Sequence, residues 1–184
     1  MTARDAVRSI EVWARERDLD FRHDGESGHG AVFSRCGRYR YLLWRDADAA
    51  SRFLAIAMLN PSRADHLHND ATIGRCHGRA RDMGGALLVW NLFALREKSP
   101  AILKRRRGPV GRHNPDAIRL ALKLAPRTIA AWGVHGAHRG QGAAVLRTCR
   151  DAGVTLECYG TTKDGHPRHP LYLKSETRPR AYTV

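Results

Sequence analysis

Apolar residues gather in four short runs, at positions 53–59, 86–90, 128–132 and 154–159. Each run is uncharged or nearly so, and glycine or proline marks its boundaries. Periodicity alone does not separate such a run from a buried helix segment, so the run length and the bounding residues decide. Short apolar runs between chain breakers are typical of parallel strands buried on both faces. We therefore predict four buried strands.

Helical spacing and helix-end signals occur between these strands. The pair Asn69-Asp70 can cap a helix over residues 71–83. Asn114, followed by proline, can cap a second helix that runs to about residue 125. A third helix is expected over residues 140–152, where a glycine follows. Strands that alternate with helices predict crossover connections and a sheet covered on both faces.

The first part of the chain has a different pattern. Apolar residues at helical spacing predict a basic first helix, in which Thr2 and Asp5 can form a capping box. Residues 18–30 are rich in Asp, Gly and His and are expected to form a loop. Apolar segments at 31–34 and 39–44 flank a turn-forming sequence, which predicts an antiparallel hairpin at one edge of the sheet.

These elements predict a three-layer α/β/α fold with a central, mainly parallel four-stranded sheet, an N-terminal helix and an antiparallel hairpin. The 184 residues are expected to form one domain, with the N-terminal helix and loop at 1–30, the core at 31–175 and a tail at 176–184. No apolar stretch approaches membrane-spanning length, and the charged first segment does not resemble a signal peptide. We expect a soluble, cytoplasmic monomer that does not bind membranes.

Charge changes this picture. The chain has 32 Lys and Arg against 18 Asp and Glu, a formal net charge of +14. Such an excess favours polyanions through counterion release, and the densest basic run is Lys104, Arg105, Arg106 and Arg107. DNA or a nucleotide is therefore the expected partner. The alternative is a general arginine bias in composition without any role in binding. The four cysteines have no CxxC spacing, so neither a zinc knuckle nor a disulfide framework is indicated. We expect neither a metal nor a cofactor.

A short polar segment follows each predicted strand or lies close beyond it, at 60–65, 91–96, 133–135 and 165–173. The carboxyl ends of neighbouring parallel strands lie at one edge of a sheet, where open α/β folds bind ligands. We therefore expect these four polar segments to form one site.

Sequence blocks in and around these segments carry a resemblance to a family. They include the segments 38–44, 58–65, 70–76, 91–96, 131–133 and 162–173. Over about residues 35–174 the chain resembles the domain of unknown function 1643 family. Membership of that family identifies related proteins but does not indicate which reaction they catalyse. Arg63 stands where the family pattern has Thr, which makes the local surface more basic.

The order of blocks is also similar to that of the uracil-DNA glycosylase superfamily. Asn60-Pro61 ends the first strand, Asn91 ends the second, Trp132-Gly133 ends the third, and His169-Pro170 lies in the last loop. This resemblance implies a uracil-DNA glycosylase-like fold and a hydrolase that cleaves the N-glycosidic bond of a base flipped out of DNA, without a metal.

Residue chemistry agrees with such a reaction. His169 or His166 can donate to the departing base, Asn60 can hold the attacking water, and the Asn91 amide can read the base edge. Substrate contacts are predicted for Pro61, Ser62, Asp65, Asn91, Phe93 and Tyr172. Phosphate contacts are predicted for Arg63, Arg96, Lys104, Arg105, Arg106, Arg107 and Arg168.

Other interpretations remain open. The superfamily usually places a stacking aromatic ring shortly after the first motif, but no aromatic residue lies between Asn60 and Trp90. Phe93 or Tyr172 can substitute, and the target can be uracil, a modified base or a free nucleotide. Asn60 and Asn91 can also simply terminate strands, and the loop with His166 and His169 can be purely structural.

A second function class fits the same pattern. The scaffold can be a non-catalytic nucleic-acid or nucleotide binder, in which Arg105, Arg106 and Arg107 matter and His169 does not. His66 and His68 lie close to Asp65, but His-x-His in a polar loop is more often solvated than metal-binding.

Overall fold

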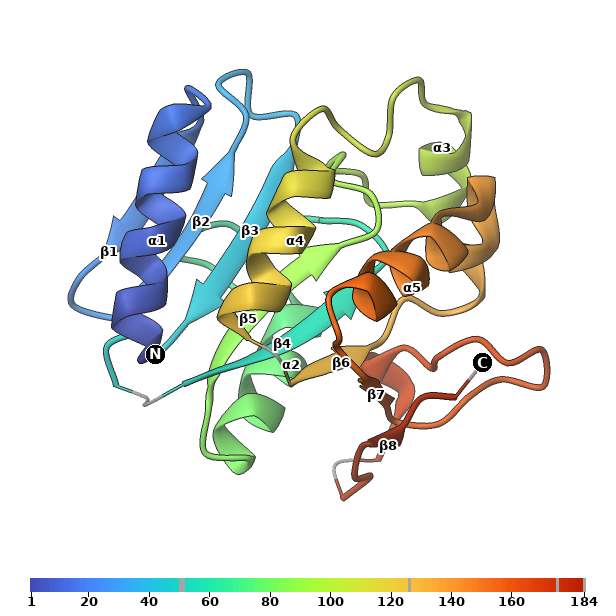
Figure 1. Cartoon of the computed structure of the whole chain (residues 1–184). Coiled ribbons are helices and arrows are strands. Elements are labelled where there is room, and N and C mark those ends of the chain that lie inside the picture. Colours follow the sequence, from blue (N-terminus) through green and yellow to red (C-terminus); the bar gives the residue numbers. More distant parts are fainter. Residues whose placement is uncertain (50–51, 126, 175, 184) are drawn as a thin grey trace.

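One mixed β-sheet organises the protein (Figure 1). The computed structural model describes residues 1–49, 52–125, 127–174 and 176–183. Across these residues the sheet has eight strands in the order β1-β2-β3-β5-β4-β6-β7-β8. The strands are β1 (Asp20–Asp24), β2 (His29–Phe33), β3 (Arg40–Arg45), β4 (Phe53–Met58), β5 (Ala86–Asn91), β6 (Thr128–Ala130), β7 (Leu156–Cys158) and β8 (Arg180–Ala181).

Helices cover both faces of this sheet. They are α1 (Ala3–Glu16), α2 (Ala71–Asp82), α3 (Pro100–Arg105), α4 (Asn114–Leu124) and α5 (Gln141–Asp151), with 3-10 turns η1 (Val134–Gly140) and η2 (Pro170–Tyr172). Apolar side chains of α1, α4 and α5 pack with one face of the sheet. Those of α2 pack with the opposite face. None of the helices in the described part of the chain has the length and apolar character needed to span a membrane.

The four predicted strands form a parallel core, in which β4 pairs with β5 and β6, and β6 pairs with β7. The predicted hairpin is β2 and β3, whose antiparallel pair joins the core where β3 runs antiparallel to β5. The α/β class and the parallel core are therefore confirmed. The sheet as a whole is larger than predicted and has more antiparallel than parallel pairs, because β1 adds to one edge and β8 to the other.

Both extra strands come from segments that the sequence assigned otherwise. The prediction of a loop over 18–30 was wrong, since β1 lies within it, and β8 lies in the predicted tail. β1 has no buried residue, and both residues of β8 are exposed. A polar edge strand lacks the apolar pattern on which strand prediction depends. The predicted boundaries at positions 175 and 184 lie outside the described residues.

The ends of the helices have identifiable causes. Thr2 Oγ1 accepts a 3.1 Å hydrogen bond from the Asp5 amide, and the Asp5 carboxylate accepts from the Thr2 amide, so the predicted capping box is present. Asp70 caps α2 by accepting a 2.9 Å hydrogen bond from the Ile73 amide.

The predicted cap of α4 was wrong. His113 is the N-cap residue, and Asn114 is fully buried as the first residue of the helix. Asn114 Nδ2 donates to the carbonyl oxygens of Asn91 and Leu92, at 3.0 and 3.1 Å. The Asn114 amide thus holds the end of β5 instead of the start of its own helix.

The register of the β4–β5 pair determines where the polar residues that follow these two strands lie. Its register runs from Phe53 opposite Ala86 to Met58 opposite Asn91, so both strands end at the same level. Along β5, Leu88 and Trp90 face the layer of α1 and α4, whereas Leu87 and Val89 face α2. By this alternation Asn91 lies on the α2 side.

We expect that Gly30→Ala destabilises the protein, because Gly30 on β2 packs directly against its neighbours. A Cβ atom at Gly30 would overlap the ring of Trp44 and lie 2.6 Å from the Arg22 carbonyl oxygen. Overpacking of this kind costs about 1–3 kcal/mol. Urea denaturation measures the free energy of unfolding. The matched control is Gly25→Ala, whose Cβ meets no atom within 4 Å and should change stability by less than about 0.5 kcal/mol. Equal stability of the two variants would contradict this packing.

Candidate functional site

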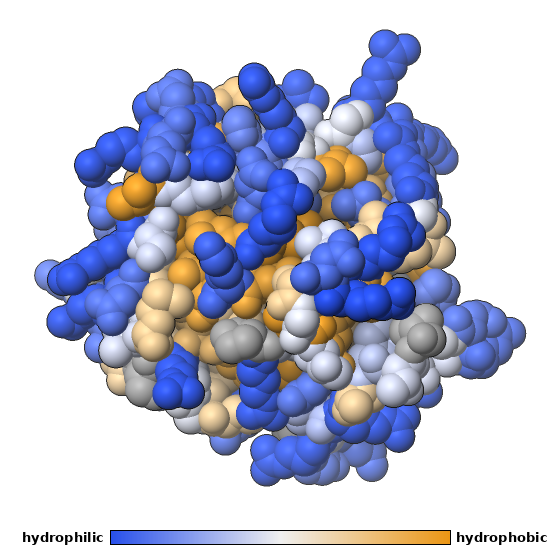
Figure 2. Space-filling view, in the orientation of Figure 1, coloured by the Kyte–Doolittle hydropathy of each residue, from blue (hydrophilic) through white to orange (hydrophobic). Residues whose placement is uncertain are grey.

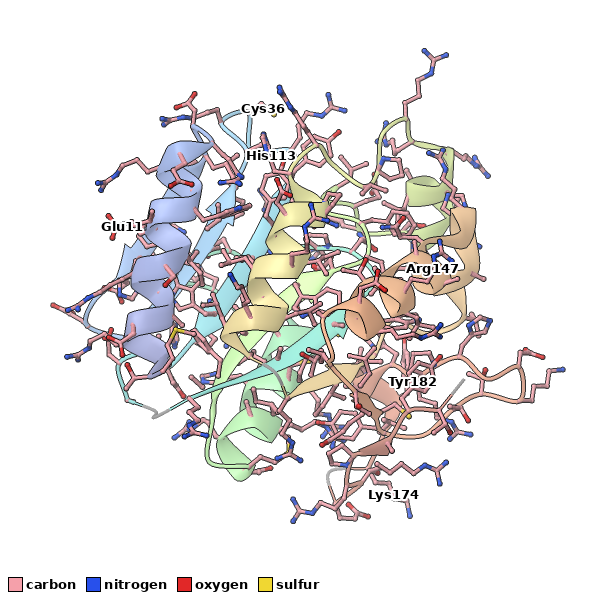
Figure 3. All side chains as sticks on the ribbon, viewed as in Figure 1. Glu11, Cys36, His113, Arg147, Lys174 and Tyr182 are labelled. Carbon is pink, nitrogen blue, oxygen red and sulfur yellow. The ribbon has the colours of Figure 1, made fainter. Side chains whose placement is uncertain are left out.

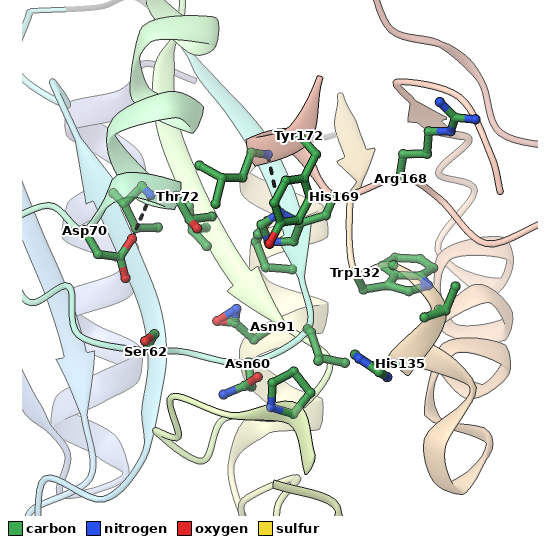
Figure 4. A pocket seen from close by; sticks show the side chains of 18 of the residues that line it. Asn60, Ser62, Asp70, Thr72, Asn91, Trp132, His135, Arg168, His169 and Tyr172 are labelled. Carbon is green, nitrogen blue, oxygen red and sulfur yellow. Dashed lines mark hydrogen bonds between the residues drawn. The ribbon is translucent and has the colours of Figure 1, made fainter. Parts of the chain in front are cut away.

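A cavity of about 560 Å³ opens where β4, β5 and β6 end (Figure 4). All four predicted polar segments contribute to its wall. Of the predicted site residues, the ones that line it are Asn60, Ser62, Asn91, Arg168, His169 and Tyr172. Asp70, Thr72 and Ile73 at the start of α2 form another part of the wall. Residues that are far apart in the sequence therefore share one concave surface.

Other predicted residues lie outside this wall. They are Pro61, Arg63, Asp65, Phe93, Arg96, the basic run 104–107 and His166. Phe93 is fully buried with its ring 5.7 Å from that of His138, so it is not available for stacking against a substrate. The Asp65 carboxylate accepts hydrogen bonds from the amides of Leu67 and His68 and thereby closes a turn.

Asn60 is held in one orientation by its own loop. Its Nδ2 donates to the carbonyl oxygens of Pro61, at 2.9 Å, and of Glu97, at 2.7 Å. Both amide hydrogens are therefore used within the protein. This arrangement leaves Asn60 Oδ1 to accept a hydrogen bond from a molecule in the cavity.

Asn91 brings an unsatisfied donor to the same wall. Its side chain is 2% exposed, and Nδ2 has no hydrogen-bond partner among the described residues. A buried amide donor without a partner costs about 1–3 kcal/mol. An acceptor on a bound molecule would remove that cost. Asn91 can therefore recognise a ligand at little expense in reorganisation, because Asn114 already fixes its backbone.

His169 is set up as a neutral donor. Its Nδ1 accepts a 3.3 Å hydrogen bond from the Leu171 amide, which assigns the hydrogen of the neutral ring to Nε2. Burial lowers the pKa of His169 below its usual value, and the charge of Asp70 partly opposes this shift. The neutral form is therefore favoured at neutral pH. By contrast, the His166 amide donates to Thr162 Oγ1, and its ring is not part of the cavity wall.

Tyr172 lies at the mouth of the cavity. It is 84% exposed, and its ring centre is 5.7 Å from that of His169. An exposed aromatic ring beside a cavity suits stacking against a planar ligand. Tyr182 lies in the C-terminal segment (Figure 3). Its hydroxyl donates to the Gly165 carbonyl oxygen at 3.1 Å, and so ties this segment to the loop that carries Arg168 and His169.

Arg40 is a wall residue that the sequence prediction missed. Its side chain is 2% exposed, its Nη1 donates to the Ala64 carbonyl oxygen at 2.8 Å, and burial lowers its pKa to about 9. The group therefore remains a cation at neutral pH. Its position at the start of β3 was hidden because the sequence places it among apolar strand residues. Trp132, Thr72 and His135 also line the cavity and had received no role.

Basic side chains near the cavity differ in availability. The exposed run 104–107 follows Glu97, Lys98 and Pro100 of the wall, and Arg106 pairs with Glu97 at 3.3 Å. Arg96 donates to the Gly37 carbonyl oxygen and lies over the Phe33 ring, so the protein itself engages it. Figure 2 shows hydrophilic side chains projecting around the margin of the face that carries α1, α4 and α5.

The family model described as "Protein of unknown function (DUF1643)" matches residues 40–171. The chain belongs to this family. The predicted membership is thereby confirmed. The matched segment of this DUF1643 protein begins at Arg40 and includes every residue of the cavity wall except Tyr172 and Leu173. A search of curated proteins gave no match.

We expect the His169 ring to titrate below its ordinary pKa of 6.5, because burial disfavours the charged form. At about pH 7.5 the ring should carry its hydrogen on Nε2. Long-range ¹H–¹⁵N NMR correlations report both the tautomer and the titration, and the His169→Gln spectrum assigns the signals. A charged ring at that pH, or a hydrogen on Nδ1, would contradict this geometry.

Proposed function

We propose that this protein is a nucleic-acid-acting enzyme, a DNA glycosylase-like hydrolase that cleaves the N-glycosidic bond of a flipped base. One observation carries the proposal: Asn60, Asn91 and His169 meet in a single cavity with the exposed ring of Tyr172 at its mouth. The parallel core, with polar groups at its carboxyl ends, supports a uracil-DNA glycosylase-like fold by analogy.

Cleavage of this bond leaves its electrons on the departing base, so the site must stabilise an anion. His169 Nε2–H donates to a base oxygen, and this donor needs no proton uptake because the ring is already neutral. The buried cation of Arg40 adds favourable charge at the wall. Donors fixed in a water-poor cavity are worth more than the same groups in water.

The remaining groups position the reactants. Asn60 Oδ1 accepts a hydrogen bond from the attacking water, whose oxygen bonds to the cationic sugar carbon after the base has left as an anion. The proton that this water loses is taken up by the departed base. The Asn91 amide reads the base edge through its unsatisfied donor. Tyr172 stacks on the base, while Arg168 and the basic run 104–107 contact DNA phosphates.

A specific observation favours the alternative of a non-catalytic nucleic-acid or nucleotide binder. Two carboxylates lie among the described wall residues, and both are engaged within the protein. Asp70 caps α2 and Glu97 pairs with Arg106. Neither is available as a general base, so binding without turnover is a coherent second function.

Base release distinguishes the two functions. Single- and double-stranded oligonucleotides containing uracil, hypoxanthine, xanthine or bulky modified pyrimidines are incubated with the protein, and abasic sites are scored. We expect His169→Gln to lower the rate by about 100- to 1,000-fold, the loss typical of one anion-stabilising donor. His166→Gln is the matched control, since His166 lies outside the wall, and should retain full activity.

Two results would contradict the enzyme. One is base release that survives in His169→Gln, and the other is no release from any oligonucleotide of the panel. Unchanged oligonucleotide binding by both histidine variants, together with no product from the unaltered protein, would favour the binder.

Stacking by Tyr172 is tested with a pair of substitutions. Tyr172→Ala should weaken oligonucleotide binding by roughly 5- to 150-fold, the equivalent of about 1–3 kcal/mol for a lost base–aromatic stack. Tyr172→Phe keeps the ring and should bind almost normally. Fluorescence anisotropy measures both affinities. Because Tyr172 is highly exposed, both substitutions should leave the fold intact. Equal affinities of the two variants would rule out stacking.

A further inference from the structure

A second cluster of chemically active side chains lies outside the cavity wall. It consists of His29 at the start of β2, Asp46 directly after β3, and His77 on α2. One candidate ligand atom from each residue lies within 4.8 Å of the others. Three different elements thus bring two imidazoles and one carboxylate together.

The carboxylate of Asp46 is the centre of this cluster. Its Oδ2 lies 2.7 Å from His77 Nε2, and its Oδ1 lies 3.5 Å from His29 Nε2. The side chains are only 14–23% exposed. Asp46 has a left-handed backbone with φ of +58°, a conformation that a non-glycine residue adopts at some cost when its surroundings require it. The backbone is therefore bent where the carboxylate meets both rings.

Two arginine side chains lie near the cluster. Arg81 Nε lies 3.7 Å from Asp46 Oδ2, but the Arg81 side chain is 70% exposed and can turn into solvent. Arg45 directs its guanidinium to Asn69 Oδ1 and to the Asp65 carbonyl oxygen.

We propose that His29, Asp46 and His77 form a binding site for a divalent first-row transition metal, with Zn²⁺ as the fitting probe. Two imidazole nitrogens and one carboxylate oxygen suit such ions, whereas Mg²⁺ and Ca²⁺ prefer oxygen ligands alone. Three protein ligands leave a coordination position for water or a small ligand. The bound ion replaces the hydrogen of the His77–Asp46 hydrogen bond and links β2, β3 and α2.

The test uses the full chain after a chelator has removed any metal. Isothermal titration calorimetry then measures its binding of Zn²⁺. We expect one equivalent to bind, with an affinity that falls by more than about 100-fold in His77→Gln and in His29→Gln, beyond the usual effect of an outer-shell partner. Asp46→Asn should weaken binding in the same direction. His68→Gln is the matched control, because His68 and Asp65 form an exposed pair outside the cluster, and it should bind as the unaltered protein does.

Circular dichroism checks that each variant is folded. If a histidine variant does not fold, Asp46→Asn, which preserves the shape of the side chain, takes its place in the test. Absence of saturable Zn²⁺ binding by the unaltered protein would overturn the proposal. The proposal would also be overturned if His29→Gln and His77→Gln bound one equivalent of Zn²⁺ as tightly as the unaltered protein, or if the site preferred Mg²⁺ to Zn²⁺. The result is independent of base release, since His169→Gln should still bind Zn²⁺.

Discussion

The parallel ladder between β4 and β5 is the constraint on which the cavity depends. Its hydrogen bonds continue beyond the strands, because the Leu92 and Phe93 amides donate to the Met58 and Leu59 carbonyl oxygens at 2.9 Å. A shift of one residue would turn Asn91 to the other face of the sheet. Asn114 opposes such a shift by donating to the carbonyl oxygens of Asn91, the last residue of β5, and of Leu92, which follows it. Buried packing of ordinary apolar strands therefore places a polar amide at the cavity wall.

The sequence predicted those parts of this arrangement that leave a pattern in neighbouring residues of the chain, and it missed those that depend on tertiary contacts. Apolar runs predicted the parallel core, and the polar segments after them do meet at one edge. β1 and β8 escaped prediction because exposed edge strands carry no apolar alternation. Arg40 was hidden among strand residues, and the His29, Asp46 and His77 cluster has no sequence spacing, since only the tertiary fold brings those elements together.

The electrostatics of the cavity follow from its burial. Removal from water lowers the pKa of Arg40 to about 9, so Arg40 is still a cation at neutral pH, and it lowers the pKa of His169, which favours the neutral ring. Poor screening raises the cost of an unpaired charge and equally strengthens its attraction for an opposite charge. A site of this composition favours a ligand on which negative charge develops, in agreement with the positive charge of the whole chain.

If the proposed hydrolase function is correct, the engaged wall carboxylates bear on which kind of hydrolysis it is. Attack on an ester or amide needs a strong nucleophile, and Asp70 and Glu97 are both occupied by protein partners. Departure of a base as an anion instead leaves a cationic sugar, which reacts with water without prior removal of a proton. Such a reaction requires the protein to stabilise an anion and to position a water molecule. Under the proposed function, His169 and Arg40 would meet the first need and the fixed amide of Asn60 the second, so the engagement of both wall carboxylates fits a dissociative reaction better than direct displacement.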